Sequence, residues 1–252
     1  MSDNDIQTDY KKSTEPDGTI RLAKRVAEMV PCSRAEADKY IAGGWVLVDG
    51  VVVEEAGARV ADEQEVVLHE DATLSEVLPV TILLHKPAGV DAVDSVKLLT
   101  ESTLVQADHG KQRFLKRHLA NLTVTTPLDA RATGLVVYTQ DFRVTRKLLD
   151  EAQRVEQEFV VEVAGDIREG GLALLNHGLS FNGKPLAPMK ASWQNETRLR
   201  FAGKGIRPGQ LVHMCRMVGL TVVSTRRIRV GRVPMASLPV GHWRYLHEYE
   251  RF

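Results

Sequence analysis

Apolar residues recur at helical spacing near the start of the chain. Leu22, Val26 and Val30 lie four residues apart with basic side chains on the other faces, and this period predicts a helix. Pro31 ends this helix, because proline clashes with the preceding turn. Residues 1–18 are polar and show no such period, so we expect a disordered segment there.

A second helix and a hairpin are predicted next. Ser33 with Glu36 three residues later is a capping-box signature, which marks the start of a helix. Two valine-rich runs then flank Asp49-Gly50, residue types that supply the positive φ angles of a type I′ turn. Residues 19–68 are therefore predicted to form a small unit of two helices and a β-hairpin.

The rest of the chain mixes strand and helix patterns. A polar linker is expected at 69–79, followed by one larger domain over 80–252. Apolar runs predict strands at 80–86, 128–139 and 158–163, and helical periodicity is found at 144–152. The predicted fold class is α+β, with a small N-terminal unit and a larger mixed domain.

Bulk composition is that of a globular protein, with 43% hydrophobic residues. No apolar run reaches the roughly 18–20 residues that cross a bilayer, and the first residues lack the apolar core of a secretory signal. Cys32 and Cys215 are expected to be reduced thiols. These features predict a cytoplasmic protein with no membrane partner. The sequence shows no coiled-coil pattern that would indicate a stable oligomer, so a monomer is expected.

The charge distribution is uneven although the net charge is zero. From Lys184 to Arg232 there are eleven lysines and arginines and a single acidic residue, Glu196. Such a segment creates a local positive field even in a neutral molecule. It indicates either a nucleic-acid surface or an ordinary solvated basic surface.

Asp129 is the most informative carboxylate. It lies in PLDARATGLVVYTQD, at the edge of an apolar run and two residues before Arg131. An aspartate there is ordinarily a turn residue or an ion-pair partner, and the alternative is a catalytic group. The histidines show no HxH or HxxxH spacing, and Walker A and GxGxxG motifs are absent, so no metal or cofactor is predicted.

The first unit resembles the S4 RNA-binding module. The resemblance covers RLAKRVAEMVPCSRAEADKYIAGGWVLVDGVVV and is most specific in CSRAEADKYI and the later V-DG. It implies that Arg21, Lys24, Arg34 and Lys39 on the two helices contact structured RNA, because basic residues on a rigid helix pair can follow phosphates. The alternative is a helix pair that only packs against the rest of the protein.

The remainder resembles the RsuA/RluB-type ribosomal RNA pseudouridine synthases. LHKPAGV, LDARATGLVVYTQD, EQEFVVEV, GLSFNGKPLAP, QLVHMCRMVGLTV and RRIRVGRVPMASLPVGHWRYL occur in that family's order. LDxxxxGL and the closing LPxGxWRxL are the most specific of these motifs. The resemblance implies a mixed α/β catalytic domain around a mainly antiparallel sheet, and a reaction that detaches uracil from its ribose, rotates it and rejoins it through carbon without a cofactor.

The resemblance also implies site residues. Asp129 maps onto the catalytic nucleophile, and Arg131 is expected to pair with it and to contact a phosphate. Gly134 and Leu135 are expected to let the strand pass close to the sugar, and Lys86 to lie at the cleft edge. The complete set of substrate contacts that the resemblance implies is Lys86, Arg131, Thr133, Gly134, Leu135, Phe159 and Gln210, with RNA contacts from Arg226, Arg227 and Arg229 as well.

Five residues around this site depart from the family pattern. Pro127 replaces an arginine, and Phe159 stands where a tyrosine usually stacks on the target base. A phenyl ring can still stack but has no hydroxyl. Two arginines of the NRQ-(I/V)-RR-M run are Val212 and His213, and an expected leucine is Thr225.

Three hypotheses follow. The first is a pseudouridine synthase acting on a structured RNA, with ribosomal RNA as the expected substrate. The second is an RNA-binding or ribosome-assembly factor that kept the fold without turnover. The third is a synthase acting on transfer RNA.

Overall fold

The computed structural model describes residues 18–105 and 113–252. The expected disordered segment at 1–18 therefore lies outside the described residues except for Gly18. The chain divides into two compact units, one running to Leu78 and including residues 115–117, and one made of Pro79–Phe114 and His118–Phe252. Each unit is described by itself.

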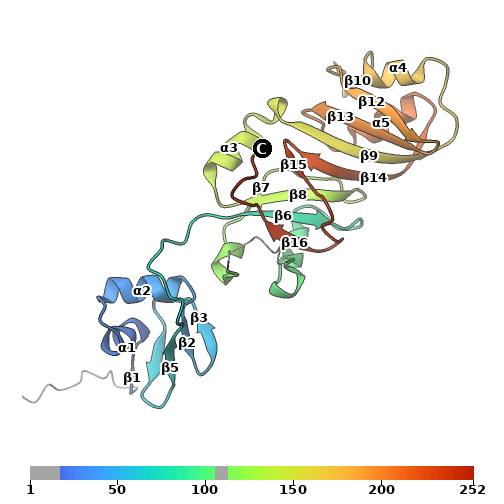
Figure 1. Ribbon diagram of the computed structural model, residues 1–252. Helices are drawn as coiled ribbons and strands as arrows, with labels where there is room; N and C mark the ends of the chain where they lie inside the picture. Colours follow the sequence, from blue (N-terminus) through green and yellow to red (C-terminus); the bar gives the residue numbers. More distant parts are fainter. Residues whose placement is uncertain (1–17, 106–112) are drawn as a thin grey trace, which may run out of the picture. The chain divides into compact units, whose positions relative to one another are not determined.

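The described residues of the first unit form two helices and five short strands. Helices α1 (Leu22–Met29) and α2 (Arg34–Ala42) precede a sheet of order β3-β2-β5 (Figure 1). A separate pair joins β1, which comes before α1, to β4. The strands are β1 (Thr19–Arg21), β2 (Val46–Val48), β3 (Val51–Val53), β4 (Arg59–Ala61) and β5 (Val66–Leu68). The two helices and the hairpin are as predicted, whereas β1, β4 and β5 were not predicted from the sequence.

The predicted capping box at α2 is confirmed. Ser33 Oγ accepts from the Glu36 N–H at 3.2 Å, and Glu36 Oε2 accepts from the Ser33 N–H at 2.7 Å. These hydrogen bonds hold the pKa of Glu36 below its ordinary value. At the hairpin turn Asp49 has φ 50° and Gly50 has φ 78°, which agrees with a type I′ turn.

The second unit is built on a nine-stranded sheet. Its main order is β12-β13-β9-β14-β8-β6-β16, with β15 paired to β14 and β7 paired to β8 (Figure 1). Every pairing is antiparallel except that of β14 with β8, so the mixed, mainly antiparallel sheet is confirmed. The strands are β6 (Thr81–Lys86), β7 (Thr123–Val124), β8 (Thr133–Thr139), β9 (Glu156–Ala164), β12 (Lys190–Asn195), β13 (Arg198–Lys204), β14 (Thr221–Val230), β15 (Val233–Pro234) and β16 (Trp243–Tyr245), with a separate pair β10 (Ser180–Phe181) and β11 (Lys184–Pro185).

Helices cover this sheet on both faces. Alternate residues of β6 divide between two hydrophobic clusters, since Ile82 and Leu84 belong to one and Leu83 to the other. Helices α4 (Gly171–Asn176) and α5 (Gln210–Met217) contribute to the first cluster, and α3 (Phe142–Leu149) contributes to the second. Short 3₁₀ turns are Asp94–Leu98, Glu101–Thr103, Lys116–Leu119 and Ala152–Arg154. The face that carries α5 also carries the candidate site.

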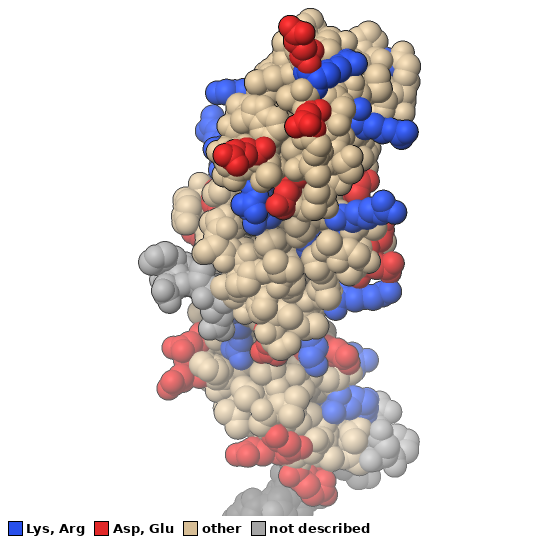
Figure 2. Space-filling view, turned by 90° about the vertical axis from the view of Figure 1, so that its right-hand side faces the viewer, with Lys and Arg blue, Asp and Glu red and all other residues tan. Residues whose placement is uncertain are grey.

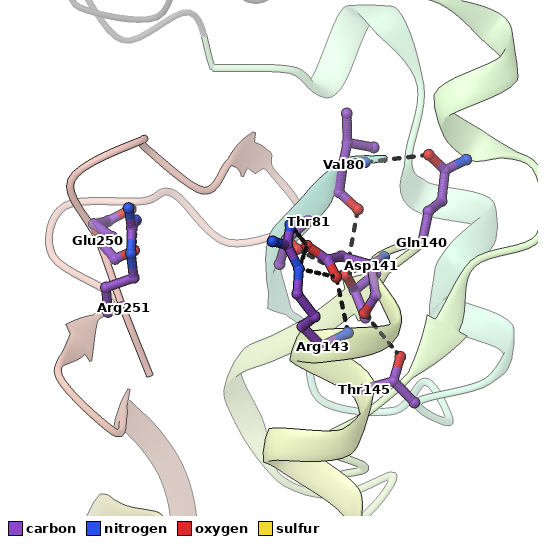
Figure 3. Close-up of polar contacts among 9 residues, drawn as sticks. Val80, Thr81, Gln140, Asp141, Arg143, Thr145, Glu250 and Arg251 are labelled. Carbon is purple, nitrogen blue, oxygen red and sulfur yellow. Dashed lines mark hydrogen bonds and ion pairs between the residues drawn. The ribbon is translucent and has the colours of Figure 1, made fainter. Parts of the chain in front are cut away.

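Helix α3 begins at a capped position. The Asp141 carboxylate accepts from the Arg143 N–H at 2.8 Å and pairs with the Arg143 guanidinium at 2.9 Å, while Thr145 Oγ1 donates to the Asp141 carbonyl (Figure 3). Gln140 Oε1 accepts from the Val80 N–H at 3.3 Å, which ties this turn to the start of β6. An N-cap aspartate satisfies a helix donor that otherwise has no partner.

Gly134 lies where β8 passes β14. It pairs in parallel with Arg227, has φ +118°, and a Cβ there would lie 2.3 Å from the Arg227 carbonyl oxygen. Only glycine fits this crossing. The expectation that Gly134 makes room for a sugar is therefore wrong, because its close neighbour is protein backbone.

Candidate active site

A small pocket lies on the α5 face of the larger unit. Its walls are the segment before β8 and the loop before α5, and its floor comes from β9 and β14. The lining residues are Pro127, Leu128, Asp129, Ala132, Phe159, Ile206, Arg207, Pro208, Gly209, Leu211, Val212, Thr225 and Arg227. The free volume is about 20 Å³, which is room for about one water molecule.

Asp129 is half-buried at the wall of this pocket. Its carbonyl accepts from the Ala132 N–H at 3.0 Å, which closes a tight turn. Its Oδ2 accepts from the Gly209 N–H at 2.7 Å. The carboxylate is thus oriented by a backbone donor that lies eighty positions away in the chain.

Gly209 can present this donor because of its backbone conformation. It is the N-cap of α5 with φ +76°, a left-handed conformation that glycine adopts without strain. The N–H groups at a helix start have no partner within the helix, so they can bind an acceptor outside it. Asp129 is that acceptor.

The expected ion pair between Asp129 and Arg131 is not formed. Arg131 is exposed, and among the residues that the structure describes no ion pair joins it to Asp129. Both residues lie in the turn that the hydrogen bond from the Ala132 N–H to the Asp129 carbonyl closes. Arg131 is accessible to a phosphate, which is the other role expected for it.

Arg227 is buried inside the pocket wall. It is 2% exposed and donates to the carbonyls of Leu135 at 2.7 Å, Thr126 at 2.5 Å and Pro127 at 3.3 Å, and to Gln157 Oε1 at 3.1 Å. Burial lowers the pKa of its guanidinium. The prediction of a surface RNA contact is wrong for Arg227, because its donors hold the segment that precedes Asp129.

Phe159 lies on the pocket floor, as a stacking role requires. It is 4% exposed, and the Arg227 guanidinium carbon lies 5.8 Å from its ring centroid. Phe159 and Arg227 are opposite each other in the β9–β14 pairing, which puts both side chains on the same face of the sheet. The ring therefore lines the same pocket as Asp129.

Lys86 is not at a cleft edge. It is fully buried, and its Nζ donates to the carbonyls of Pro87 at 2.8 Å, Val90 at 2.7 Å and Ala130 at 3.3 Å. Burial lowers the pKa of Lys86, and the nearby Asp91 opposes this lowering. Lys86 thus ties the loop after β6 to the Asp129 turn, and its predicted substrate contact is wrong.

Three further predicted contacts are structural in their observed positions. Thr133 Oγ1 donates to the Lys86 carbonyl at 2.7 Å, and Leu135 is fully buried in the cluster on the opposite face of the sheet. Gln210 is 3% exposed, and its Oε1 accepts from the Arg207 N–H at 3.2 Å. Neither Leu135 nor Gln210 lines the pocket, so the predicted substrate contacts are not what these positions show, and Gln210 instead shapes the loop before α5.

Arg207 and Gly209 were missed by sequence reasoning. Arg207 is exposed at the pocket rim, and Gly209 supplies the donor to Asp129. Glycine carries no chemical signal in a sequence, and Arg207 is one of many basic residues in its segment. Val212 also lines the pocket, whereas His213 contacts the Phe181 ring and the Ser180 carbonyl outside it.

The side chains predicted to contact RNA differ in their exposure and in their ion pairs within the protein. Arg226, Arg21, Arg34 and Lys39 are exposed, and Lys24 lies 3.9 Å from Glu28. Arg229 pairs with Glu158 at 2.9 Å and with Glu156, so its charge is largely neutralised within the sheet. The expectation of a free phosphate contact is therefore wrong for Arg229.

The excess of positive charge in the segment from Lys184 to Arg232 is smaller in the folded structure than the sequence suggests. Arg198 and Arg200 pair with Glu162 and Glu158 of β9. Figure 2 shows lysine and arginine side chains projecting along one edge of the larger unit, in the upper part of the view, with acidic side chains among them. Glutamates from a neighbouring strand thus offset part of the segment's charge.

The described residues, 18–105 and 113–252, offer neither a metal centre nor a membrane span. They contain no group of three or more His, Cys, Asp or Glu residues that could hold a metal ion. None of their helices is long and apolar enough to cross a membrane. The two cysteines are free, and burial raises the pKa of Cys215 to about 12.

Residues 20–66 match the S4 domain family. An uncharacterized RNA pseudouridine synthase of Aquifex aeolicus is 28% identical over 92% of this chain and 94% of its own length. The dual-specificity RNA pseudouridine synthase RluF of Escherichia coli is 26% identical over 93% of this chain and 78% of its own. The ribosomal large subunit pseudouridine synthase B of Bacillus subtilis is also 26% identical, over 92% and 94%.

One solved structure supports the fold. A crystal structure of a pseudouridylate synthase aligns with a TM-score of 0.56 and 22% identity over 91% of this chain and 96% of that chain. The S4 match and the relatives that span both units agree with the order of motifs in the sequence. The chain is therefore similar over both units to the RsuA/RluB-type pseudouridine synthases, and its N-terminal part matches the S4 domain family.

Proposed function

We propose that this protein isomerises a specific uridine in structured RNA to pseudouridine, with Asp129 as the catalytic nucleophile. The observation that carries the proposal is the position of Asp129. Its carboxylate lies at the wall of a pocket floored by Phe159 and is oriented by the Gly209 N–H. The relatives that match over most of the chain are named RNA pseudouridine synthases.

The reaction needs no atom from outside the substrate except exchangeable protons. The bond between ribose C1′ and uracil N1 breaks, and a bond between C1′ and uracil C5 forms after the base has rotated. The C5 proton leaves and N1 takes up a proton, so the product is an isomer. A carboxylate can attack C1′, stabilise its developing positive charge, or remove a proton from C2′.

The surrounding groups support these steps. A uridine that has left its stack can lie against Phe159, since aromatic rings stack on bases. Arg227 holds the segment before Asp129 and the ring beneath the base. Arg131 and Arg207 are exposed near this pocket and can contact phosphates of the flipped nucleotide.

Ribosomal RNA is the proposed substrate. The relative from Bacillus subtilis is named for the ribosomal large subunit, and the S4 unit has exposed basic residues at the end of β1 (Arg21) and on α2 (Arg34 and Lys39). We assign residues 19–68 to RNA binding, 69–79 to a linker and 80–252 to catalysis. The monomeric state and cytoplasmic location stay predictions, and light scattering of the purified protein tests the first.

Pseudouridine mapping on defined RNAs tests the function. Unmodified transcripts of Escherichia coli ribosomal RNAs and of transfer RNAs are incubated with the protein, and pseudouridines are located by chemical labelling. We expect modification at one or a few uridines in a ribosomal RNA. Modification confined to transfer RNA would overturn the substrate class, and binding without modification of either class or of ribosomal subunits would favour a non-catalytic RNA-binding factor.

A further inference from the structure

Thr225 has a buried hydroxyl without a partner. It lies on β14 opposite Val161 of β9, two residues before Arg227, which lies opposite Phe159. Thr225 and Phe159 therefore share one face of the sheet. Within the described part of the chain, Thr225 Oγ1 is covered and has no hydrogen-bond partner.

This hydroxyl belongs to the candidate active site. Thr225 lines the same pocket as Asp129, Phe159 and Arg227. The polar atoms of Arg227 in that wall are all directed to carbonyls and to Gln157, and one Asp129 oxygen accepts from Gly209. Thr225 Oγ1 is thus a polar group of the pocket floor that the protein's own hydrogen bonds leave unused.

A buried hydroxyl without a partner lowers the stability of the folded state. Valine has nearly the same shape and would fill the position without that cost. The free volume of the whole pocket is about 20 Å³. A pyrimidine ring is larger, so its entry requires the lining side chains to move apart, and it brings polar edge atoms to this floor.

We propose that Thr225 Oγ1 forms a hydrogen bond with the polar edge of the target uracil, which makes Thr225 a base-binding residue of this site. The proposal rests on the pseudouridine synthase function. A hydroxyl can donate to a uracil carbonyl oxygen or accept from the ring N3–H. A ring stacked on Phe159 would lie beside Thr225, since both residues line the pocket and lie on the same face of neighbouring strands.

The proposal predicts opposite signs for stability and activity in Thr225→Val. Removing an unpartnered hydroxyl leaves the thermal midpoint unchanged or raised. The rate of pseudouridine formation at saturating enzyme falls about 5- to 10-fold, because the variant forms one hydrogen bond fewer to the base. RNA affinity stays near wild type, since it comes mainly from phosphates. A structural hydroxyl would give the reverse pattern, with lower stability and no specific decrease in rate.

The experiment compares single-turnover rates, RNA dissociation constants and thermal midpoints on the ribosomal RNA transcript that the wild type modifies. Thr225→Ser, which keeps the hydroxyl, recovers most of the rate. Thr221→Val, at an exposed position of the same strand, controls for removal of a threonine outside the pocket. A Thr225→Val rate equal to wild type, or a lowered thermal midpoint, overturns the proposal. If the wild-type protein modifies no RNA, the proposed function itself is contradicted, and the proposal for Thr225 is contradicted with it.

Discussion

At the scale of the residue, the Asp129 carboxylate depends on a backbone donor from another segment. The Gly209 N–H lies 2.7 Å from Asp129 Oδ2, and the left-handed φ of Gly209 sets the direction of that N–H. A Cβ at this position would meet only a Phe181 ring carbon at 3.9 Å. A side chain there is therefore strained by backbone conformation and not by crowding.

Gly209→Ala tests this dependence. We expect the free energy of unfolding to fall by about 1–2 kcal/mol, because alanine is strained in the left-handed region. Relaxation of that strain turns the N–H away from Asp129 and lowers the rate of pseudouridine formation. Gly170→Ala is the matched control, since Gly170 has φ +69° at the start of α4 and no atoms near its Cβ position. Equal rates for the two variants would show that the Gly209 N–H does not matter for the reaction.

Sequence reasoning placed some site residues and misplaced others. It brought Asp129 and Phe159 to one site, and both line the same pocket. It misassigned Lys86 and Arg227, because their residue type suggests exposure whereas their donors are directed to buried carbonyls. Residue type reports chemistry, and burial depends on contacts between segments that are far apart in the chain.

At the scale of the element, β9, β13 and β14 share a charged cluster on the face opposite Phe159. Glu158 lies between Arg200 and Arg229 and is 6% exposed. Burial alone would raise the pKa of Glu158, but its hydrogen bonds to the two guanidiniums outweigh burial and lower it. The cluster joins the three strands by charge-assisted hydrogen bonds.

Glu158→Gln is expected to change the pH dependence of stability. Because the folded-state pKa of Glu158 is lowered, its stabilisation is present above the unfolded value, about 4.3, and disappears as pH falls through the folded pKa. The wild type should exceed the variant by about 1–2 kcal/mol at pH 7, and urea unfolding from pH 6 to pH 3 should show this gap closing. Glu162→Gln, on the same strand with a single ion pair to Arg198, is the control. A gap that stays constant to pH 3 would contradict the lowered pKa.

Some helices and strands could be predicted from the sequence, and others could not. The capping box and the Asp-Gly turn are local signals, and they located α2 and the hairpin. The strands β1, β4 and β5 are three residues long and carry no period, so their sequence alone does not reveal them. The parallel pairing of β14 with β8 depends on Gly134 meeting Arg227, a contact between distant segments.

At the scale of the whole molecule, RNA affinity should come from phosphate contacts of both units. In the S4 unit, combined alanine substitution of Arg21, Lys24, Arg34 and Lys39 should weaken binding of a ribosomal RNA transcript. The slope of log affinity against log salt should fall by about 0.7–0.9 for each phosphate that the variant no longer neutralises. Lys97→Ala, which removes an exposed lysine paired with Asp94, is the control for charge alone. An unchanged salt slope would contradict RNA binding through the S4 helices.

The two-part organisation was readable from sequence, because each part has its own ordered motifs. The S4 match at 20–66 falls within the smaller unit, which runs to Leu78. The charge of the catalytic part was less readable. Glutamates of β9 neutralise arginines of β13 and β14 that are more than thirty positions away in the chain. Counting charged residues within one segment of the sequence does not reveal such ion pairs with another segment.

Pseudouridine formation by Asp129→Asn tests the central claim most directly. The asparagine keeps the shape of the side chain and removes the carboxylate charge. The yield of pseudouridine on the ribosomal RNA transcript that the wild type modifies is measured beside Asp166→Asn, a change at an exposed aspartate of the same unit. We predict no detectable product with Asp129→Asn, RNA binding retained, and wild-type yield with Asp166→Asn. Product formed by Asp129→Asn at the wild-type rate would contradict Asp129 as the nucleophile.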